Sequence, residues 1–296
     1  ILYNFLKDNR EKYVIHSMQS NVAAIIIGIL KKKKIIIRNS ENPIYSSIYS
    51  ENKFFAFISI ILKYLFYNFA DGIITNSKGS GKSLQLFVFN KKKIKTIYNP
   101  YIKKINKKKF KKKNFIITVG RLRKQKDQKT LIEAFQIFSK TNRRYKLLII
   151  GNGILDKKLK QLTRNLQIDN RVIFKGWIKD TSKYLKHSKI FVLSSIYEGL
   201  GNVLIDAINY DVPCVSTNCP SGPSEILLNG KGGHLVKSKS PRLLAKKIKY
   251  SLDNYPISRQ KNILAKKKID RFLISTQTKK YFDYLSKFYK WLYNTY

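Results

Sequence analysis

Residues 197–206 read Tyr-Glu-Gly-Leu-Gly-Asn-Val-Leu-Ile-Asp, and this stretch decides the fold. An apolar, β-prone run precedes it at residues 190–193, and apolar residues that tolerate a helical period follow from Val203 to Ile208. The local order is therefore a strand, a glycine turn and a helix. This order is typical of an α/β protein with a parallel sheet.

The residues that follow continue the alternation. Asp211-Val212-Pro213 predicts the end of the helix, residues 214–217 predict the next strand, and residues 221–226 predict a further loop and helix. Glycine turns between a strand and a helix are common in α/β folds. By itself, the turn is equally consistent with an ordinary crossover that binds nothing.

Two carboxylates, Glu198 and Asp206, lie on either side of the turn. Backbone N–H groups at the start of a helix, together with the positive end of the helix dipole, favour a bound phosphate. One carboxylate can face a sugar and the other can face a ribose. The stretch therefore predicts a site for a nucleotide sugar.

A basic loop follows another predicted strand. Residues 115–119 are a buried strand that ends at Gly120, and Arg121 and Lys126 precede a helix predicted at residues 130–138. Cations at the carboxyl end of a parallel strand lie where α/β sheets bind ligands. A guanidinium can bind two phosphate oxygens and an ammonium acts as a point charge, so the pair suits a diphosphate leaving group. In a chain this rich in lysine, the alternative is a basic loop that is only solvated.

Taken together, these motifs resemble those of the retaining glycosyltransferases of family 4. The resemblance runs from about Asn76 to the C-terminal end and is most specific over residues 197–227. The segments that carry it are Gly120-Arg121-Leu122 with Lys126, Gly151-Asn152-Gly153, Glu198 to Asp206, and Ser221-Gly222-Pro223-Ser224-Glu225-Ile226. Within the family, the chain is most similar to enzymes that extend lipid-linked or lipopolysaccharide sugars. The resemblance implies the α/β GT-B fold, which has two Rossmann-like lobes.

The resemblance also implies a role for each site residue. Arg121 and Lys126 would hold the diphosphate, and Glu198 would meet the sugar hydroxyls. Asp206 would bind the ribose diol, at a position where the family usually has Glu. His16 would point into the cleft at the sugar, although a lone histidine is more often a loop or capping residue. The other substrate-binding positions implied are Gly120, Gly151, Gly153, Trp177, Gly199, Leu200, Gly201, Asn202 and Val203.

No metal or other cofactor is expected. The three histidines show no metal-ligand spacing, and no Asp-x-Asp motif stands beside a predicted strand. The cations of Arg121 and Lys126 would act in place of a metal, with the nucleotide sugar as co-substrate. By resemblance, the donor is a UDP-sugar that carries a hexose or N-acetylhexosamine. The acceptor is a glycan or a polyprenyl-diphosphate-linked sugar in surface polysaccharide synthesis.

The 296 residues can form two domains. Strands and helices alternate on both sides of a lysine-rich stretch whose like charges repel one another, which predicts a linker. The chain begins at Ile1 and shows no early strand with a glycine-rich loop, so an incomplete N-terminal lobe is expected. The predicted division is a partial acceptor-side domain at 1–102, a linker at 103–113, a nucleotide-sugar domain at 114–275, and a helix crossing back to the first lobe at 276–296.

The formal net charge is +43, with an isoelectric point near 10.2. Such a surface attracts nucleic acid or an anionic bilayer. No zinc-ligand set, RNA-binding aromatic signature or recognition helix is found, so no specific nucleic-acid partner is expected. A basic nucleic-acid-binding protein stays an alternative function, as does a GT-B epimerase or hydrolase of sugar nucleotides. A compositional bias towards lysine would explain part of the charge without any binding role.

Residues 54–69 are aromatic and aliphatic, but Lys63 interrupts them and they fall short of the roughly 20 residues that a spanning helix needs. They predict a helix that faces the core of the N-terminal domain. The alternative is an interfacial helix with Lys63 at its edge, which would give peripheral contact with an anionic membrane. Residues 281–296 predict a second packed helix, with its apolar residues at helical spacing: Phe282, Leu285, Phe288, Tyr289 and Leu292.

Cys214 and Cys219 are the two cysteines. Two cysteines do not predict a disulfide framework, and no signal peptide is visible. The cytoplasm is therefore the expected location, with peripheral contact at the inner face of the cytoplasmic membrane.

Overall fold

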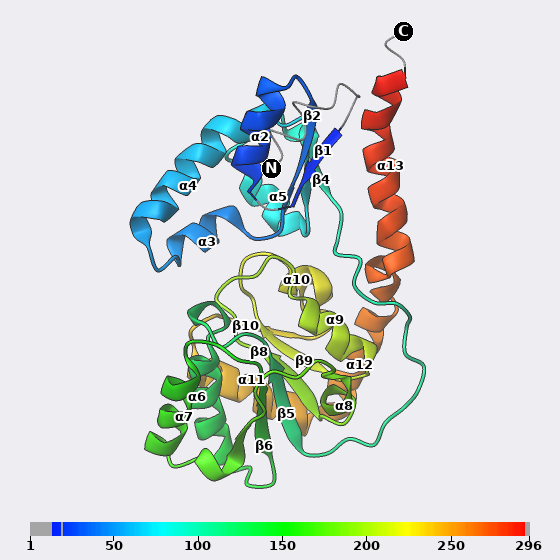
Figure 1. The fold of residues 1–296 in the computed structure, drawn as a ribbon. Helices are drawn as coiled ribbons and strands as arrows, with labels where there is room; N and C mark the ends of the chain where they lie inside the picture. The colour runs from blue at the N-terminus through cyan, green and yellow to red at the C-terminus, as the bar shows by residue number, and fades with distance from the viewer. Residues whose placement is uncertain (1–13, 19, 294–296) are drawn as a thin grey trace. The chain divides into compact units, whose positions relative to one another are not determined.

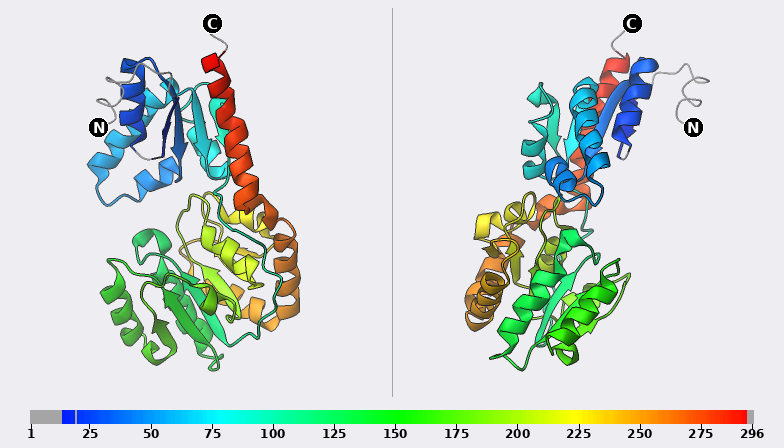
Figure 2. Two further views of the ribbon diagram at one scale, coloured as in Figure 1. Left: turned by 45° about the vertical axis from the view of Figure 1, so that its right-hand side comes forward. Right: turned by 90° about the vertical axis from the view of Figure 1, so that its left-hand side faces the viewer.

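A computed structural model describes residues 14–18 and 20–293, with side chains as far as Tyr289. These residues divide into two units, each built on its own parallel sheet (Figures 1 and 2). Unit 1 combines the chain up to Pro100 with the segment from Ile274 onwards, and unit 2 is Tyr101–Leu273.

Unit 1 has four strands in the order β1-β2-β3-β4. Its elements are β1 (Val14–Ser17), α2 (Asn21–Leu30), β2 (Lys34–Asn39), α3 (Pro43–Ile48), α4 (Lys53–Phe66), β3 (Gly72–Thr75), α5 (Lys78–Leu84), β4 (Ile94–Thr96) and α13 (Ile274–Tyr293). Strand side chains alternate between the two faces of the sheet. Ile35 and Ile37 of β2 pack in the cluster that contains Ile25 of α2, whereas Ile36 packs in the cluster that meets α13. Accordingly, α2 and α13 cover opposite faces (Figure 2).

The packed face of α13 differs in part from the prediction. Leu285 and Phe288 lie against the sheet together with Tyr281 and Tyr284, which follows the i, i+3, i+4, i+7 spacing of one helix face. Phe282 falls off this face and is 73% exposed, and Tyr289 is 45% exposed. The side chain of Leu292 lies outside the described residues.

The prediction that residues 54–69 face the core is wrong for many of their apolar side chains. Ala56 is the buried residue of α4, whereas Phe54, Phe55 and Phe57 are exposed. No helix in the described part of the chain has a stretch long and apolar enough to cross a bilayer.

Unit 2 has six strands in the order β10-β9-β8-β5-β6-β7. Its strands are β5 (Phe115–Val119), β6 (Lys146–Ile150), β7 (Val172–Phe174), β8 (Ile190–Leu193), β9 (Cys214–Thr217) and β10 (His234–Val236). Its helices are α6 (Gln128–Ser139), α7 (Asp156–Asn165), α8 (Ser182–Leu185), α9 (Asn202–Asn209), α10 (Pro223–Ile226), α11 (Pro241–Asp253) and α12 (Tyr255–Lys266). The strands and helices predicted around the glycine turn and the basic loop are confirmed.

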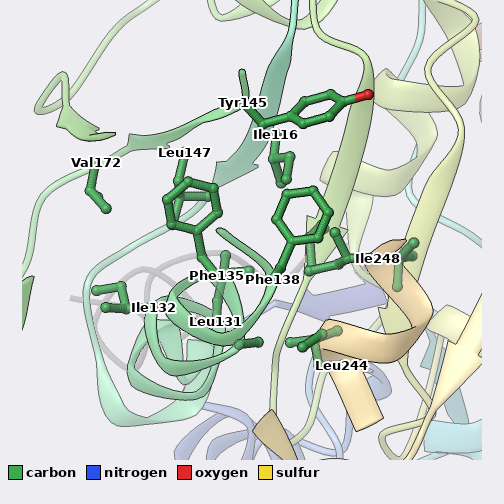
Figure 3. Close-up of a cluster of buried hydrophobic side chains, with 14 of the residues drawn as sticks. Ile116, Leu131, Ile132, Phe135, Phe138, Tyr145, Leu147, Val172, Leu244 and Ile248 are labelled. Atoms are coloured by element: carbon green, nitrogen blue, oxygen red, sulfur yellow. The ribbon is translucent and has the colours of Figure 1, made fainter. Parts of the chain in front are cut away.

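The core of unit 2 lies between the sheet and the helices α6 and α11 (Figure 3). Leu131, Phe135 and Phe138 of α6 recur at helical spacing and are almost fully buried. The rings of Phe138 and Tyr145 are 5.5 Å apart, within the range of favourable aromatic contact. This apolar layer holds β5 and β8 in place, and the loops of interest follow these two strands.

The basic segment 103–113 contains neither helix nor strand, yet it is held against unit 2. The ammonium group of Lys112 donates to the carbonyl oxygens of Lys186 at 3.0 Å and Tyr210 at 2.9 Å. Burial lowers the pKa of Lys112 to about 8. The ring of Phe110 lies 5.9 Å from that of His187. Charge repulsion therefore does not keep this segment away from the fold, because main-chain carbonyl groups accept from its lysine.

Candidate functional site

The candidate site lies where the strand order of unit 2 reverses. From β5 the chain adds β6 and β7 on one side, and it then adds β8, β9 and β10 on the other. In open α/β sheets, ligands bind outside the carboxyl ends of the strands at such a reversal. The parallel pairing of Ile116 with Ile190 and of Ile117 with Phe191 brings the loops after β5 and β8 to the same edge.

An ion pair joins these two loops. Nζ of Lys126 lies 2.6 Å from Oε1 of Glu198, and the two side chains are 16% and 6% exposed. Ser195 donates its hydroxyl to the same Glu198 oxygen at 2.6 Å. A Cβ atom on Gly120 would lie 3.6 Å from the Lys126 stem, so this side chain runs over Gly120. The structure therefore brings Gly120, Lys126 and Glu198 together, as the sequence predicted.

Further hydrogen bonds hold the two loops in register. Gln125 donates to the carbonyl oxygen of Tyr197 at 3.1 Å and accepts from the backbone N–H of Ile196 at 2.8 Å. The hydroxyl of Ser194 donates to the carbonyl oxygen of Lys126 at 2.8 Å. Sequence reasoning missed Ser194 and Ser195, although two small polar residues directly after a buried strand were a usable signal.

Arg121 lies on the same loop and is exposed. Its carbonyl oxygen accepts from the side chain of the buried Gln128 at 3.0 Å, which fixes the backbone at this point. Within the described residues, the guanidinium group has no hydrogen-bond or ion-pair partner. A side chain that can bind two phosphate oxygens thus follows Gly120 directly, on the loop that carries Lys126.

The glycines after β6 are required by close backbone contact with the basic loop. At Gly151, where φ is +135°, an added Cβ atom would lie 2.0 Å from the backbone oxygen of Gly120. At Gly153 it would lie 2.3 Å from the backbone oxygen of Leu122. The backbone N–H of Gly151 donates to the carbonyl oxygen of Gly176 at 2.7 Å. This bond places the residue before Trp177 next to the loop that follows β6. Trp177 is 69% exposed, so its indole ring is accessible to a base.

The glycine corner after β8 is held by the loop after β9. A Cβ atom on Gly222 would lie 2.0 Å from the Leu200 oxygen, so only glycine allows this approach. Gly201 has φ of +89° and is the N-cap of α9, which gives that helix no side-chain cap. The predicted backbone positions therefore lie in one corner and the first helical turn, and these positions are Gly199, Leu200, Gly201, Asn202 and Val203.

Asp206 lies one turn into α9, where its Oδ2 accepts a hydrogen bond of 2.6 Å from the hydroxyl of Tyr101. Burial raises the pKa of Asp206 to about 6, against a smaller opposing effect of this bond. Burial and the neighbouring carboxylate also raise the pKa of Tyr101. Sequence reasoning missed Tyr101, because no local pattern links residues 105 positions apart.

Tyr101 also lies at the boundary of unit 2. The backbone N–H groups of Tyr101 and Ile102 donate to the oxygen of Phe272 at 3.1 Å, and Ile102 pairs with Leu273 in a parallel bridge. Within unit 2, the two ends of the chain that connect to unit 1 are thus bonded to each other.

His16 belongs to unit 1, in β1, whereas the other predicted site residues belong to unit 2. Its ring centre is 6.2 Å from that of Tyr281. Partial burial lowers the pKa of His16, and the positive charge of Arg38 lowers it further by a smaller amount. The charged form of the imidazole is therefore disfavoured.

Metal-binding clusters are not found in the described part of the chain, where no three His, Cys, Asp or Glu side chains gather suitably. Cys214 and Cys219 are buried and unpaired, and burial raises the pKa of both thiols.

Comparison with known proteins gives a family match and close relatives. The family model described as glycosyl transferases group 1 matches residues 102–269. An uncharacterised glycosyltransferase from Methanocaldococcus jannaschii is 34% identical over 249 residues, which cover 76% of this chain and 61% of the relative. The chain thus spans about three fifths of that relative's length.

A second relative, from Campylobacter jejuni, is N-acetylgalactosamine-N,N'-diacetylbacillosaminyl-diphospho-undecaprenol 4-alpha-N-acetylgalactosaminyltransferase. It is 29% identical over 259 residues, which cover 84% of this chain and 70% of the relative. Among solved structures, HepE from Anabaena in complex with UDP matches with a TM-score of 0.82 at 19% identity, covering 96% of this chain and 81% of HepE. The predicted GT-B fold with two Rossmann-like lobes is confirmed.

Proposed function

Because the chain belongs to the glycosyl transferases group 1 family, we propose that it transfers a hexosyl or N-acetylhexosaminyl group from a UDP-sugar to a glycan or polyprenyl-diphosphate-linked acceptor. The transfer retains the anomeric configuration, as in family 4, and contributes to surface polysaccharide synthesis. The observation that carries the proposal is the Lys126–Glu198 pair at the strand reversal of unit 2. The UDP bound to HepE and the diphospho-undecaprenol in the name of the Campylobacter relative support this choice of donor and acceptor.

Donor binding exchanges the partners of the ion pair. The diphosphate takes the place of Glu198 beside Lys126, and a sugar hydroxyl takes the place of Lys126 beside Glu198. Both charges are largely buried, and a buried charge without a partner is costly, so the exchange must occur as one event. The ion pair therefore satisfies both side chains until a ligand that satisfies both of them replaces it.

The rest of the nucleotide extends along the same edge of the sheet. Asp206 binds the ribose diol through its carboxylate. Tyr101 donates to one of the two carboxylate oxygens, Oδ2, and the diol donates to the carboxylate as well. The base lies beside Trp177 and the loop from Gly151 to Gly153. These assignments extend the family resemblance to the geometry of unit 2.

The chemistry depends on charge that develops at the leaving group. As the bond between the sugar C1 and the β-phosphate oxygen breaks, negative charge grows on that oxygen, and a new bond forms between C1 and the acceptor oxygen. Arg121, Lys126 and the N–H groups of the corner stabilise the charge, at about 3 kcal/mol for each preorganised donor. The proton of the acceptor hydroxyl passes to the departing phosphate on the same face. The proposal uses neither a protein nucleophile nor a metal ion.

Turnover with a panel of UDP-sugars and a polyprenyl-diphosphate-linked acceptor tests the proposal. A new glycoside with retained configuration, identified by NMR, is expected. Free sugar would instead indicate a hydrolase, and an epimerised sugar nucleotide would indicate an epimerase.

A matched pair of arginine variants tests the role of the basic loop. Arg121→Ala should lower kcat/KM by about a hundredfold, because a cation that contacts the developing charge is lost. Arg123→Ala removes another exposed arginine of the same loop and should change kcat/KM by less than about threefold. Full activity of a folded Arg121→Ala protein would contradict the assignment.

A further inference from the structure

Helix α4 presents its aromatic side chains to solvent. Phe54, Phe57 and Leu65 are 68%, 63% and 52% exposed, and Ile61 and Tyr64 are also exposed. These positions recur at intervals of three and four residues, so they form one stripe along the helix. In a helix of a soluble domain, such a stripe normally faces the core.

The inward side of α4 is the less apolar side. Ala56 is buried there, and Ile60 and Phe66 pack against the core cluster of unit 1. Lys63 also lies on this side, where burial lowers the pKa of its ammonium group and the charge of Glu41 opposes that effect. The helix therefore directs a lysine inwards and its aromatic stripe outwards, and core packing does not explain the stripe.

The exposed apolar surface continues onto a neighbouring loop. The rings of Tyr64 and Phe89 meet edge to face at 5.7 Å, and the backbone N–H of Phe89 donates to the side chain of Asn68 at 2.8 Å. Phe89 itself is 73% exposed. The aromatic face, as we name this surface, comprises Phe54, Phe57, Ile61, Tyr64, Leu65 and Phe89.

Positive charge flanks the aromatic face. Lys53 begins α4, and Lys91 and Lys92 follow Phe89 closely; all three are exposed. The acidic residues of the sequence from 48 to 93 are Glu51 and Asp71, and Asp71 is paired with Lys34 at 2.8 Å. The face thus combines exposed rings with nearby ammonium groups, in a protein of net charge +43.

We propose that the aromatic face docks unit 1 onto an anionic lipid surface, with α4 lying in the plane of the interface. At 14 residues the helix is about 21 Å long, which suits an interfacial helix and is too short to span a bilayer. Lipid offers the aromatic stripe an apolar layer and offers the lysines negative charge. A nucleic acid would leave Ile61 and Leu65 in water, and a second copy of the chain would bring like charges together.

Flotation with lipid vesicles tests the proposal and needs no transferase activity, so its result is independent of the proposed function. The wild-type chain should bind vesicles of phosphatidylcholine with about 30% phosphatidylglycerol and should bind pure phosphatidylcholine more weakly. Phe54→Ser combined with Phe57→Ser should weaken binding to the anionic vesicles by about tenfold or more. Phe282→Ser removes a ring of similar exposure from α13 and should change binding by less than about twofold.

A second pair of variants separates local charge from net charge. Lys91→Gln with Lys92→Gln should weaken anionic binding by about tenfold or more. Lys157→Gln with Lys158→Gln removes the same charge from α7 of unit 2 and should have a much smaller effect. Equal losses from both pairs would show attraction by net charge alone and would overturn the proposal.

Insertion is read from a tryptophan placed in the aromatic face. Phe57→Trp should gain fluorescence that lipids with brominated acyl chains quench, whereas the wild-type signal should be quenched less. No added quenching would overturn the proposal. A dimer in sedimentation that dissociates in the variant with both Phe54→Ser and Phe57→Ser would also overturn it. The same holds for RNA binding that depends on these two rings if vesicle binding does not depend on them.

Discussion

Replacing Asp206 with asparagine should stabilise the protein at alkaline pH while weakening nucleotide binding. Burial raises the pKa of this carboxyl group to about 6, so its ionised form is disfavoured in the folded state. The asparagine side chain would be neutral at every pH, and its amide oxygen can accept the Tyr101 hydroxyl as the carboxylate does. The substitution therefore removes the cost of burying the charge and keeps the hydrogen bond.

The size of the effect follows from the two pKa values. Each pKa unit corresponds to about 1.4 kcal/mol, so the difference between the ordinary 3.8 and about 6 amounts to about 3 kcal/mol. The stability that the carboxyl group contributes is fully present below the unfolded pKa of 3.8 and is lost as the pH rises through about 6. The Asp206→Asn variant should thus match wild type at about pH 4 and exceed it by up to about 3 kcal/mol at about pH 8.

Urea titrations followed by circular dichroism at several pH values measure this difference. Asp253→Asn is the matched control, because its exposed pair with Lys249 should be worth less than about 0.5 kcal/mol at either pH. Calorimetric titration with UDP at the alkaline pH should show weaker binding by Asp206→Asn. A stability difference that does not vary with pH would refute the pKa argument, and unchanged UDP affinity would remove Asp206 from the ribose site.

Two further substitutions probe the corner and the ion pair. Lys126→Met should lower the free energy of unfolding by about 3 kcal/mol or more, because it leaves a buried carboxylate with Ser195 as its side-chain donor. Lys129→Met is the control, because Lys129 pairs with Glu133 at the surface, and its free energy of unfolding should stay within about 0.5 kcal/mol of wild type in the same urea titration. Equal losses of stability in the two lysine variants would contradict this account. Gly222→Ala should cost about 3 kcal/mol or more and reduce UDP binding, because its Cβ would lie 2.0 Å from a backbone oxygen. Gly230→Ala is the control, because Gly230 has a similar φ of +90° and the nearest atom to its Cβ would be a side-chain carbon of Leu235 at an ordinary 4.0 Å. It should cost about 1 kcal/mol by thermal denaturation. A Gly222→Ala protein as stable as Gly230→Ala would be evidence against the close contact.

Much of unit 2 was predictable because its signals are local. The runs at residues 115–119 and 190–193 are apolar over the length of one strand, and glycines mark the turns that follow them. The convergence of Lys126 and Glu198 followed from a general rule about parallel sheets, because both residues come after neighbouring strands. The sequence could not supply the steric reason for Gly151 and Gly222, which depends on a backbone oxygen in another loop.

The parts that were not predicted depend on contacts between distant residues. Tyr101 meets Asp206 across 105 positions, and no periodicity encodes that bond. The prediction for α4 was wrong because an apolar stripe shows which side chains share a face but not which way the face points. The packing of segment 103–113 was missed because a count of lysines does not show the carbonyl groups that accept from Lys112. The cytoplasmic location, the absence of a metal cofactor and the absence of a specific nucleic-acid partner stay predictions.

A crystal structure of the chain with UDP tests the central claim most directly. The account predicts that the diphosphate contacts Nζ of Lys126 and the guanidinium of Arg121 beside the glycine corner, and that the 2.6 Å bond between Lys126 and Glu198 has opened. A diphosphate bound elsewhere on the protein, with that bond still closed, would contradict it.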